Sequence, residues 1–433
     1  MNPTKTILLL IFIILSFGVK GQFCGGNLGD PLVSIDFGSG AGSALSNVPA
    51  PYQFTSQGCP NEGFYTINST SGFCFNNTWQ VVPFDHTPTD QNGLFIMINA
   101  LDGPSVIYLD TISGMCPNTT FQMEAWILNL LKPIGCNGNG IDPNLTFIIT
   151  DMQGLLLGQK TTNDFPETSV FTWVAERFTF PSPANGTVIL KIISNAAAGC
   201  GNEFALDDIS FRPCGPFVTA SFVNSGLTTQ SICETSQPNL LMTTFTSSIN
   251  VNQGYQWQIS TNQGNSWTDI PGATNQTYIR TATSAGEFWY RSLVTNTNQP
   301  SNLSCRFPSN ALIVKVVSPP FAQATNYVFG CYGSTVYLDA AGGNTYEWWG
   351  PNGFHSFNER VPIPNVDFSD AGTYVVKVTT IVGCFDYDTT SLTIYEAPIA
   401  TLSPTTASFC EGDSIQLNAG GSVRYKWFPS TGL

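Results

Sequence analysis

Short apolar runs alternate with turns rich in Gly, Pro and Asn through the first half of the chain. Examples are "GLFIMINAL", "SVIYLDTI" and "GTVILKIIS", which have the length and composition of β-strands. No long segment keeps the 3.6-residue period of an amphipathic helix. Residues 22–216 are therefore predicted to form an all-β domain, and evenly spaced strands of this number favour a two-sheet jelly-roll β-sandwich.

The second half of the chain contains a repeat. "CYGSTVYLDAAGGNTYEW", residues 331–348, aligns without a gap on "CEGDSIQLNAGGSVRYKW", residues 410–427, at an offset of 410 − 331 = 79 residues. A more diverged copy precedes both and carries Cys233, Trp257 and Cys305. A fixed period of this length predicts tandem small β-sandwiches and not a solenoid.

Each repeat has features of an immunoglobulin-like sandwich. A cysteine opens an early strand and a tryptophan lies on the third, while "SDAGTYVVKV" places Tyr374 at a tyrosine corner. We expect such domains at residues 217–318 and 319–398, the latter with a PKD-like resemblance. Residues 399–433 would begin a further repeat that stops after its third strand, so we expect the chain to be a fragment with a truncated last sandwich.

The second cysteine of each repeat comes later than in antibody domains. It is Cys305 in one copy and Cys384 in the next, near the start of the final strand. The pattern predicts bridges between an early and the last strand of the same sandwich, Cys233–Cys305 and Cys331–Cys384.

The N-terminal residues 1–21, "MNPTKTILLLIFIILSFGVKG", read as a secretory signal peptide cleaved after Gly21. The apolar run from Ile7 to Phe17 is too short to span a membrane. No later segment is expected to cross a bilayer. The mature chain is therefore predicted to be secreted or displayed on the cell surface.

Composition narrows the function classes. The chain has 433 residues, enough for several domains, and its formal net charge of −14 disfavours nucleic acid as a partner. In an exported chain, 12 cysteines predict disulfides. Only two histidines are present, His86 and His355, which argues against zinc sites and most His-dependent catalysis.

Several motifs of residues 22–216 resemble a known family. They are "FDHTPTDQNGLFIMINA", "CPNTTFQMEAWILNL", "DPNLTFIITDMQG" and "GNEFALDDISFRPCGP". They resemble a domain, similar to galactose-binding-like jelly rolls and MAM-type domains, that opens many gliding-motility-associated, adhesin-like surface proteins of Bacteroidetes. Residues 217–433 resemble the immunoglobulin-like and PKD-like repeats of the same proteins. The resemblance implies type IX secretion, with the sorting or anchoring domain in a missing C-terminal part.

Asp207 and Asp208 stand together on the last predicted strand of the first domain. Neighbouring side chains on a strand point to opposite faces, so these acids are not expected to flank one glycosidic bond as a catalytic pair. Asp207 is expected to face inward, where a carboxylate needs a partner. The galactose-binding-like resemblance implies a structural calcium ion held by Asp207 and Asp36, and a hydrogen-bonded strand-end acid is the alternative.

Two residues of the first domain are expected to contact a ligand, Trp79 and His86. Trp79 precedes a loop, so it is the tryptophan expected to be exposed and to stack on a sugar, whereas Trp126 and Trp173 are expected in the core. His86 lies in the Asp/Thr/Pro-rich segment "PFDHTPTD" beside Asp85, with no nucleophile motif. A loop held by its own side chains is the alternative for that segment.

Seven cysteines lie in residues 22–216, and spacing alone leaves their connectivity open. We expect Cys24–Cys214, because the two ends of a jelly roll adjoin, and the short-range Cys59–Cys74. A third expected pair is Cys136–Cys200, which leaves Cys116 without a partner.

These observations favour a non-enzymatic exported surface protein. The jelly-roll head would recognise a glycan or a cell or substrate surface, with the immunoglobulin-like modules as a stalk. The alternatives are accessory modules of a larger secreted hydrolase and a purely structural spacer.

Overall fold

The computed structural model describes residues 23–87, 90, 92–223, 225–247, 253–296 and 305–429. The expected signal peptide, residues 1–21, lies outside these ranges. The described chain is all-β, as predicted, with only short 3-10 turns as helices. These turns are η1 (Phe75–Asn77), η2 (Gly135–Gly138), η4 (Pro351–Gly353) and η5 (Phe368–Asp370). No helix in the described ranges is long and apolar enough to cross a membrane.

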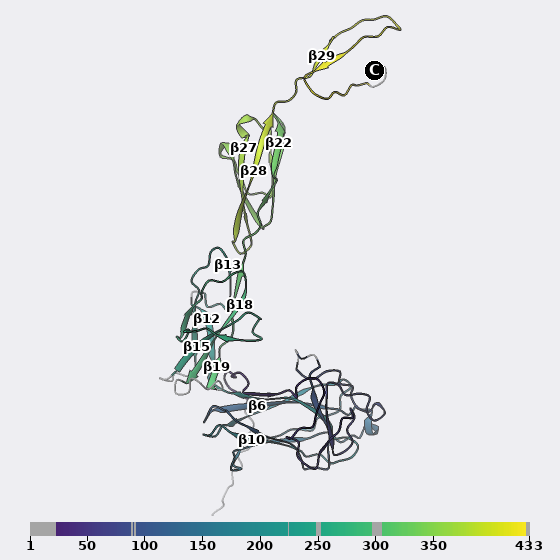
Figure 1. Cartoon of the computed structure of the whole chain (residues 1–433), viewed down its shortest axis with the longest axis vertical. Coiled ribbons are helices and arrows are strands. Elements are labelled where there is room, and N and C mark those ends of the chain that lie inside the picture. The colour runs from purple at the N-terminus through teal and green to yellow at the C-terminus, as the bar shows by residue number, and fades with distance from the viewer. Residues whose placement is uncertain are drawn as a thin grey trace, which may run out of the picture. The chain divides into compact units, whose positions relative to one another are not determined.

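The head domain is a two-layer β-sandwich (Figure 1). One layer is a 7-stranded sheet in the order β2-β3-β4-β11-β6-β9, with β1 also paired to β11, and the other is a 4-stranded sheet in the order β5-β10-β7-β8. The strands are β1 (Val33–Ile35), β2 (Gln53–Phe54), β3 (Phe64–Asn68), β4 (Phe95–Asn99), β5 (Ser105–Ile112), β6 (Thr120–Asn129), β7 (Leu145–Thr150), β8 (Leu156–Thr161), β9 (Val174–Pro181), β10 (Val188–Ser194) and β11 (Glu203–Pro213).

The main core lies between these two sheets. Alternate residues of β6, such as Phe121 and Met123, belong to the same buried cluster as Phe147 of β7 and Leu190 of β10. Each of these side chains is fully buried. The period-two pattern of the strands therefore packs into one apolar layer, which is the main stabilising term of a sandwich.

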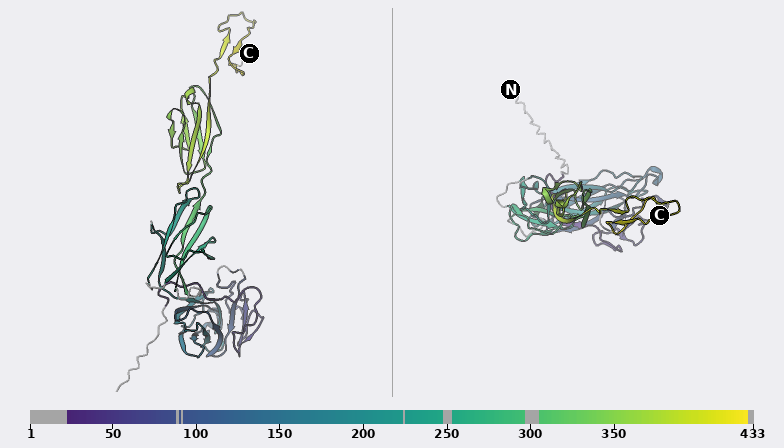
Figure 2. Two further views of the ribbon diagram at one scale, coloured as in Figure 1. Left: turned by 60° about the vertical axis from the view of Figure 1, so that its left-hand side comes forward. Right: turned by 90° about the horizontal axis from the view of Figure 1, so that it is seen from above.

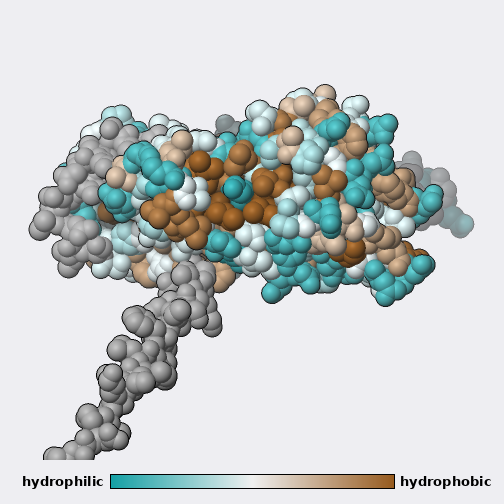
Figure 3. All heavy atoms as spheres, turned by 90° about the horizontal axis from the view of Figure 1, so that it is seen from below, coloured by the Kyte–Doolittle hydropathy of each residue, from teal (hydrophilic) through white to brown (hydrophobic). Residues whose placement is uncertain are grey.

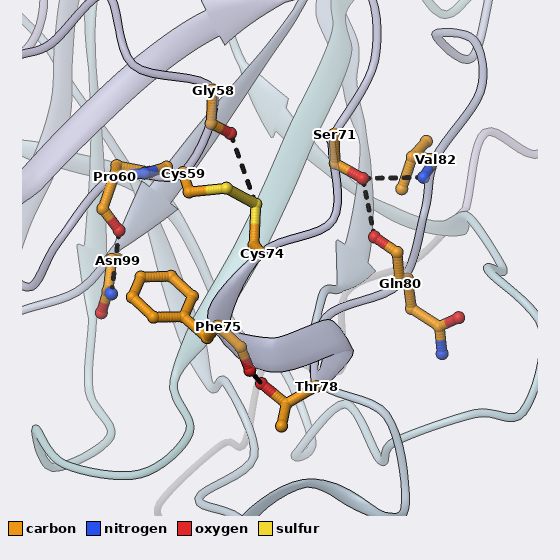
Figure 4. The surroundings of a disulfide bond; sticks show 10 residues. All are labelled: Gly58, Cys59, Pro60, Ser71, Cys74, Phe75, Thr78, Gln80, Val82 and Asn99. Atoms are coloured by element: carbon orange, nitrogen blue, oxygen red, sulfur yellow. Dashed lines mark hydrogen bonds between the residues drawn. A yellow bond between two sulfur atoms is a disulfide. The ribbon is translucent and has the colours of Figure 1, made fainter.

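A second, smaller core covers the outer face of the larger sheet. Trp79 is 1% exposed and packs with Phe95 of β4 and Leu128 of β6. The Cys59–Cys74 disulfide closes the segment that precedes Trp79. Figure 4 shows Ser71 of this segment hydrogen-bonded to Gln80 and Val82, which follow Trp79 in the chain. The prediction that Trp79 is exposed is therefore wrong, because the loop beside it folds back onto the sheet.

The outer face of the smaller sheet is largely aliphatic. Residues of β10 alternate between buried and half-buried, and Lys191 lies in the half-buried row opposite Leu109 and Ile148. β10 lies in the lower layer of the head in Figure 1, and Figure 3, seen from below, shows apolar residues gathered on that side. The aliphatic members of this face are Leu109, Ile148, Leu156, Ile189 and Ile193.

The chain divides into two compact units. The first comprises the residues up to Thr228 together with Leu240–Arg280 and Trp289–Leu312, and the second comprises Thr229–Asn239, Thr281–Phe288 and Ile313–Leu433. Besides the head, the first unit holds the 3-stranded sheet β12-β14-β17 and the antiparallel pairs β15-β16, β15-β18 and β18-β19. Their bounds are β12 (Val218–Phe222), β14 (Leu241–Thr246), β15 (Gln253–Ser260), β16 (Thr268–Asp269), β17 (Thr277–Ile279), β18 (Gly286–Asn296, of which Trp289–Asn296 belongs to this unit) and β19 (Arg306–Pro308).

The second unit contains a complete immunoglobulin-like sandwich. One sheet has the order β21-β23-β26 and the other β22-β28-β27-β24-β25. The strands are β21 (Gln323–Ala324), β22 (Tyr327–Cys331), β23 (Val336–Ala341), β24 (Thr345–Trp349), β25 (His355–Ser356), β26 (Arg360–Ile363), β27 (Gly372–Thr379) and β28 (Phe385–Tyr395). The same unit holds β13 (Thr229–Cys233), which pairs in parallel with β20 (Leu312–Val317).

The immunoglobulin-like features take their expected places in this sandwich. Trp348 on β24 is fully buried, and the hydroxyl of Tyr374 donates a 2.9 Å hydrogen bond to the carbonyl oxygen of Asp370, which forms the tyrosine corner. Further along, β29 (Thr401–Ser403) and β30 (Asn418–Gly420) form a two-stranded ladder, drawn in yellow in Figure 2. Trp427, at the repeat position of Trp348, is half-buried.

Five disulfides join ten of the cysteines. Three of them lie within the head and match the expected pairs: Cys24–Cys214, Cys59–Cys74 and Cys136–Cys200. The other two bonds are Cys116–Cys305 and Cys233–Cys384, and Cys331 and Cys410 carry free, exposed thiols.

The predicted pairs Cys233–Cys305 and Cys331–Cys384 are therefore wrong, and so is the prediction that Cys116 has no partner. Each late cysteine bonds to a cysteine outside its own sandwich. The reason is positional: Cys233 and Cys331 end their strands, while Cys305 and Cys384 precede the next strand, so both kinds lie at sandwich ends and not across a sandwich core.

Candidate functional site

A β-bulge in β11 positions the paired acids. The ladder between β11 and β6 sets Asp207 opposite Trp126 and resumes with Ser210 opposite Glu124, so its register shifts between the two pairs. Asp208 takes a left-handed backbone conformation at φ 47° within this bulge. A bulge of this kind re-aims a side chain, and it brings the carboxylates of both Asp207 and Asp208 to the segment that contains His86.

Asp207 is completely buried and fully engaged by backbone amides. The peptide NH of His86 donates to its Oδ2 at 2.8 Å, and the peptide NH of Asp208 donates to its Oδ1 at 2.8 Å. Burial nevertheless raises the pKa of Asp207 to about 8, and the nearby carboxylates of Asp208 and Asp85 act in the same direction. The two amide contacts stabilise the charged form and oppose this shift.

His86 lies between an acid and an aromatic plane. Its Nδ1 is 2.7 Å from Oδ2 of Asp208, whose Oδ1 accepts a 2.9 Å hydrogen bond from the hydroxyl of Thr87. The imidazole stacks on Trp126 with 3.7 Å between ring centroids and 18° between planes. Trp173 approaches edge-on at 6.1 Å. The ring of His86 is thus held in one orientation by several partners.

Asp85 and Asp90 form the acidic side of this segment. Asp85 is 3% exposed, and its Oδ2 has no hydrogen-bond partner in the described part of the chain. A Cβ atom at Gly93 would lie 2.0 Å from this oxygen and 2.9 Å from Oδ2 of Asp90, so only glycine leaves room for both carboxylates. Burial, followed by the charge of Asp90, raises the pKa of Asp85.

Trp126 is half-buried on the outer face of β6 and has polar neighbours. Its indole NH donates to Oε1 of Glu124 at 3.0 Å, and Arg177 forms an ion pair with the other oxygen of Glu124. The guanidinium carbon of Arg177 lies 5.8 Å from the centre of the Trp126 ring. We call Trp126, His86, Asp208, Glu124 and Arg177 the Trp126 cluster. The charged side chains of the cluster and His86 keep between 19% and 38% of their surface exposed.

The structure brings together some of the residues singled out from sequence. His86 and Asp207 are in direct contact, whereas Trp79 lies in the outer core. Burial raises the pKa of the nearby Glu203 to about 7, and a hydrogen bond with the indole of Trp79 opposes this shift. Asp36 follows β1, and its Oδ1 accepts a hydrogen bond from the NH of Gly38 at 3.0 Å. Trp126, expected in the core, is the aromatic residue that His86 covers.

The described residues show no ready-made metal centre. They contain no group of three or more His, Cys, Asp or Glu side chains arranged to hold a metal ion. Both oxygens of Asp207 already accept amide hydrogens, which agrees with the hydrogen-bonded alternative. The unsatisfied Oδ2 of Asp85 is an observation that fits a cation in this segment, because a buried carboxylate oxygen needs a partner.

Comparison with known proteins does not identify a function for this chain. A family model described as a domain of unknown function (DUF8696) matches residues 224–318. No curated protein matches the chain.

Solved structures give likenesses with TM-scores well below 0.5. They include the N-terminal four Ig domains of Dscam1 isoform 7.44 (10% identity, 73% of this chain, 84% of that chain, TM-score 0.23) and fibronectin(III)-like modules of Clostridium thermocellum CbhA (10%, 42%, 95%, 0.21). A structure titled "CBM4 structure and function" matches with 16% identity over 29% of this chain and 73% of that chain (TM-score 0.21). The fold assignment therefore rests on the strand order of the sheets themselves.

Proposed function

We propose that this chain is a non-enzymatic exported surface protein whose head recognises a glycan or another cell-surface ligand, with the immunoglobulin-like sandwiches as its stalk. The Trp126 cluster is the observation that carries the proposal. It brings together a half-buried indole, an imidazole and three charged groups from β6, β9, β11 and the segment of His86, the combination of aromatic surface and oriented polar groups by which binding sites hold a ligand.

The contacts of His86 support binding over catalysis. Its ring is stacked on Trp126 and paired with Asp208, and among the described residues no Ser or Cys side chain is hydrogen-bonded to it. A nucleophile adjacent to a base is the arrangement that acyl-transfer chemistry requires. Five disulfides also fit an oxidising environment outside the cytosol. Membership of the adhesin-like class of Bacteroidetes, with type IX secretion, is proposed on the sequence motifs alone.

Replacing Trp126 with alanine is expected to weaken ligand binding about tenfold or more, since aromatic anchors dominate the binding energy of such sites. A glycan array and a cell-adhesion assay on the full chain would identify the ligand, and titration would compare the variant with the wild type. Lys191→Ala, on the other sheet of the head, is the matched control and should bind normally. Absence of binding to every sugar and surface, or unchanged binding by Trp126→Ala with its fold intact, would refute this assignment.

A structural calcium ion beside the Trp126 cluster is a further part of the proposal. Asp207 and Asp36 remain its proposed ligands, and the unsatisfied Oδ2 of Asp85, whose charge acts on Asp207, supports a cation near them. Backbone carbonyls and water would complete the six to eight oxygens that calcium takes. The ion would neutralise buried carboxylates that otherwise repel one another.

Calcium at 100 times its dissociation constant is expected to stabilise the head by about 2.7 kcal/mol. Calorimetry should therefore show a head transition that falls on addition of a chelator while the transition of residues 319–398 stays in place. Asp36→Asn should make the head insensitive to chelator. Identical melting curves with and without calcium would remove the ion from the proposal and leave Asp207 as a hydrogen-bonded acid.

A further inference from the structure

The two free cysteines occupy repeated positions. Cys331 ends β22, and Cys410 lies 79 residues further on at the same place in the sequence repeat. Both carry exposed thiols. In a chain where the other ten cysteines are paired, unpaired thiols at one repeated position call for a structural explanation.

Cys331 has the same backbone surroundings as the bonded Cys233. Cys233 ends β13 opposite Val317, the last residue of the parallel strand β20, and Cys331 ends β22 opposite Tyr395, the last residue of the parallel strand β28. The next NH donates to the carbonyl oxygen of the opposite residue in both cases, from Glu234 at 2.9 Å and from Tyr332 at 2.8 Å. The two cysteines are therefore structurally equivalent strand-end residues.

The partners of the existing bonds are equivalent as well. Cys384 directly precedes β28, which pairs back onto β27, and Cys305 directly precedes β19, which pairs back onto β18. Cys384 bonds to the strand-end Cys233 of the preceding sandwich, and Cys305 bonds to Cys116 of the head. The bonds therefore follow one rule, in which the hairpin cysteine of each sandwich reaches the module before it.

We propose that Cys331 is the strand-end half of a third disulfide of this kind. Its partner is a hairpin cysteine, at the position of Cys384, in a second sandwich of the same repeat. This site goes beyond the recognition function proposed for the head. It is a covalent docking site between repeats, and Cys410 repeats the same half-site.

The surface around Cys331 fits a docked hairpin. Phe329 lies two residues before it and is 61% exposed, and Tyr395 opposite it is 56% exposed with 6.3 Å between the two ring centroids. Tyr332 and Phe368 form a second exposed aromatic pair beside them, at 5.6 Å. Around Cys233, the corresponding position Val317 is half-buried, and its carbonyl oxygen lies 3.7 Å from the Sγ of Cys384. A hairpin seated on Cys331 would cover the aromatic residues in the same way.

The bond forms by oxidation of two thiols. The thiolate of one cysteine attacks an oxidised low-molecular-weight disulfide such as oxidised glutathione, and one glutathione thiol leaves. The second cysteine then attacks the mixed disulfide and releases the other glutathione thiol. Two protons and two electrons thus pass from the protein to the glutathione disulfide.

The test inserts a second copy of residues 319–398 after residue 398 of the full chain. The protein is refolded in a glutathione redox buffer, free thiols are alkylated without reduction, and the disulfides are mapped by mass spectrometry. The expected result is a bond between Cys331 of the first copy and the hairpin cysteine of the second. The number of free thiols then stays at the two of the parent chain.

Two controls keep the result interpretable. The Cys233–Cys384 bond of the first copy must appear in the same map, which shows that the repeat folds. Cys331→Ser in the first copy should leave the new hairpin cysteine free without changing the melting temperature of the inserted sandwich. Alkylation of both Cys331 and the new hairpin cysteine in a folded protein, or a bond from that hairpin to any other cysteine, would overturn the proposal.

Discussion

Replacing Trp348 with alanine is expected to destabilise residues 319–398 by about 3–5 kcal/mol. The side chain is fully buried at the centre of the sandwich, and its indole NH donates to the carbonyl oxygen of Asn358 at 3.1 Å. The substitution removes this contact and leaves a large cavity. A loss of this size is comparable to the whole stability of a small domain, so hydrogen exchange of β24 and β27 should become nearly unprotected.

The adjacent Trp349 provides a matched control. It lies on the same strand but on the outer face, 37% exposed, with the ring of His355 at 5.8 Å. Trp349→Ala is expected to cost about 1 kcal/mol or less and to leave the exchange protection intact. Equal effects of the two substitutions would contradict the assignment of Trp348 to the core.

The stability of the head, measured in the presence of a chelator, is expected to fall as the pH rises from about 4 to about 8. Burial raises the pKa of Asp207 from its ordinary value of 3.8 to about 8 in the folded chain, so the folded state retains a proton that the unfolded chain releases in this range. The stability that Asp207 contributes is fully present below its pKa in the unfolded chain and is lost as the pH rises through its pKa in the folded chain. Glu203, with a pKa raised to about 7, and Asp85 act in the same direction.

Calorimetry between pH 5 and pH 9 would measure this slope. Asp207→Asn should flatten it, because the titrating group is gone, while Asp164→Asn at an exposed position of the head should leave it unchanged. Saturating calcium should reverse part of the slope if the ion binds the ionised carboxylates. If the head instead became more stable toward pH 9 in the presence of chelator, that result would contradict the raised pKa of Asp207.

Local patterns predicted the strands and the cores of the sandwiches. A period of two places Phe121 and Met123 on one face of β6 without reference to any other strand, and the repeated tryptophan marks the buried position of β24. The Trp126 cluster depends instead on register. Asp208 reaches His86 because of a bulge at one point of the β11–β6 ladder, which alternation along a single strand does not reveal.

The sequence did not predict the disulfides Cys116–Cys305 and Cys233–Cys384 or the burial of Trp79, for a related reason. Spacing places Cys305 and Cys384 near the start of a strand, but it does not say whether the neighbouring cysteine lies in the same sandwich or in the module before it. Trp79 precedes a loop, as an exposed residue would, yet the loop returns to the sheet and buries it. In both cases the outcome depends on contacts between segments far apart in the sequence.

The order of the disulfides along the chain has a consequence for its resistance to cleavage. Cys24–Cys214 spans 190 residues, Cys116–Cys305 spans 189, and Cys233–Cys384 spans 151, so each covalent loop overlaps the next. A protease that cuts any one peptide bond between Cys24 and Cys384 therefore leaves the two fragments linked. Under oxidising conditions a single cut in this range therefore releases no fragment, and the two pieces separate only after a reductant breaks the disulfides.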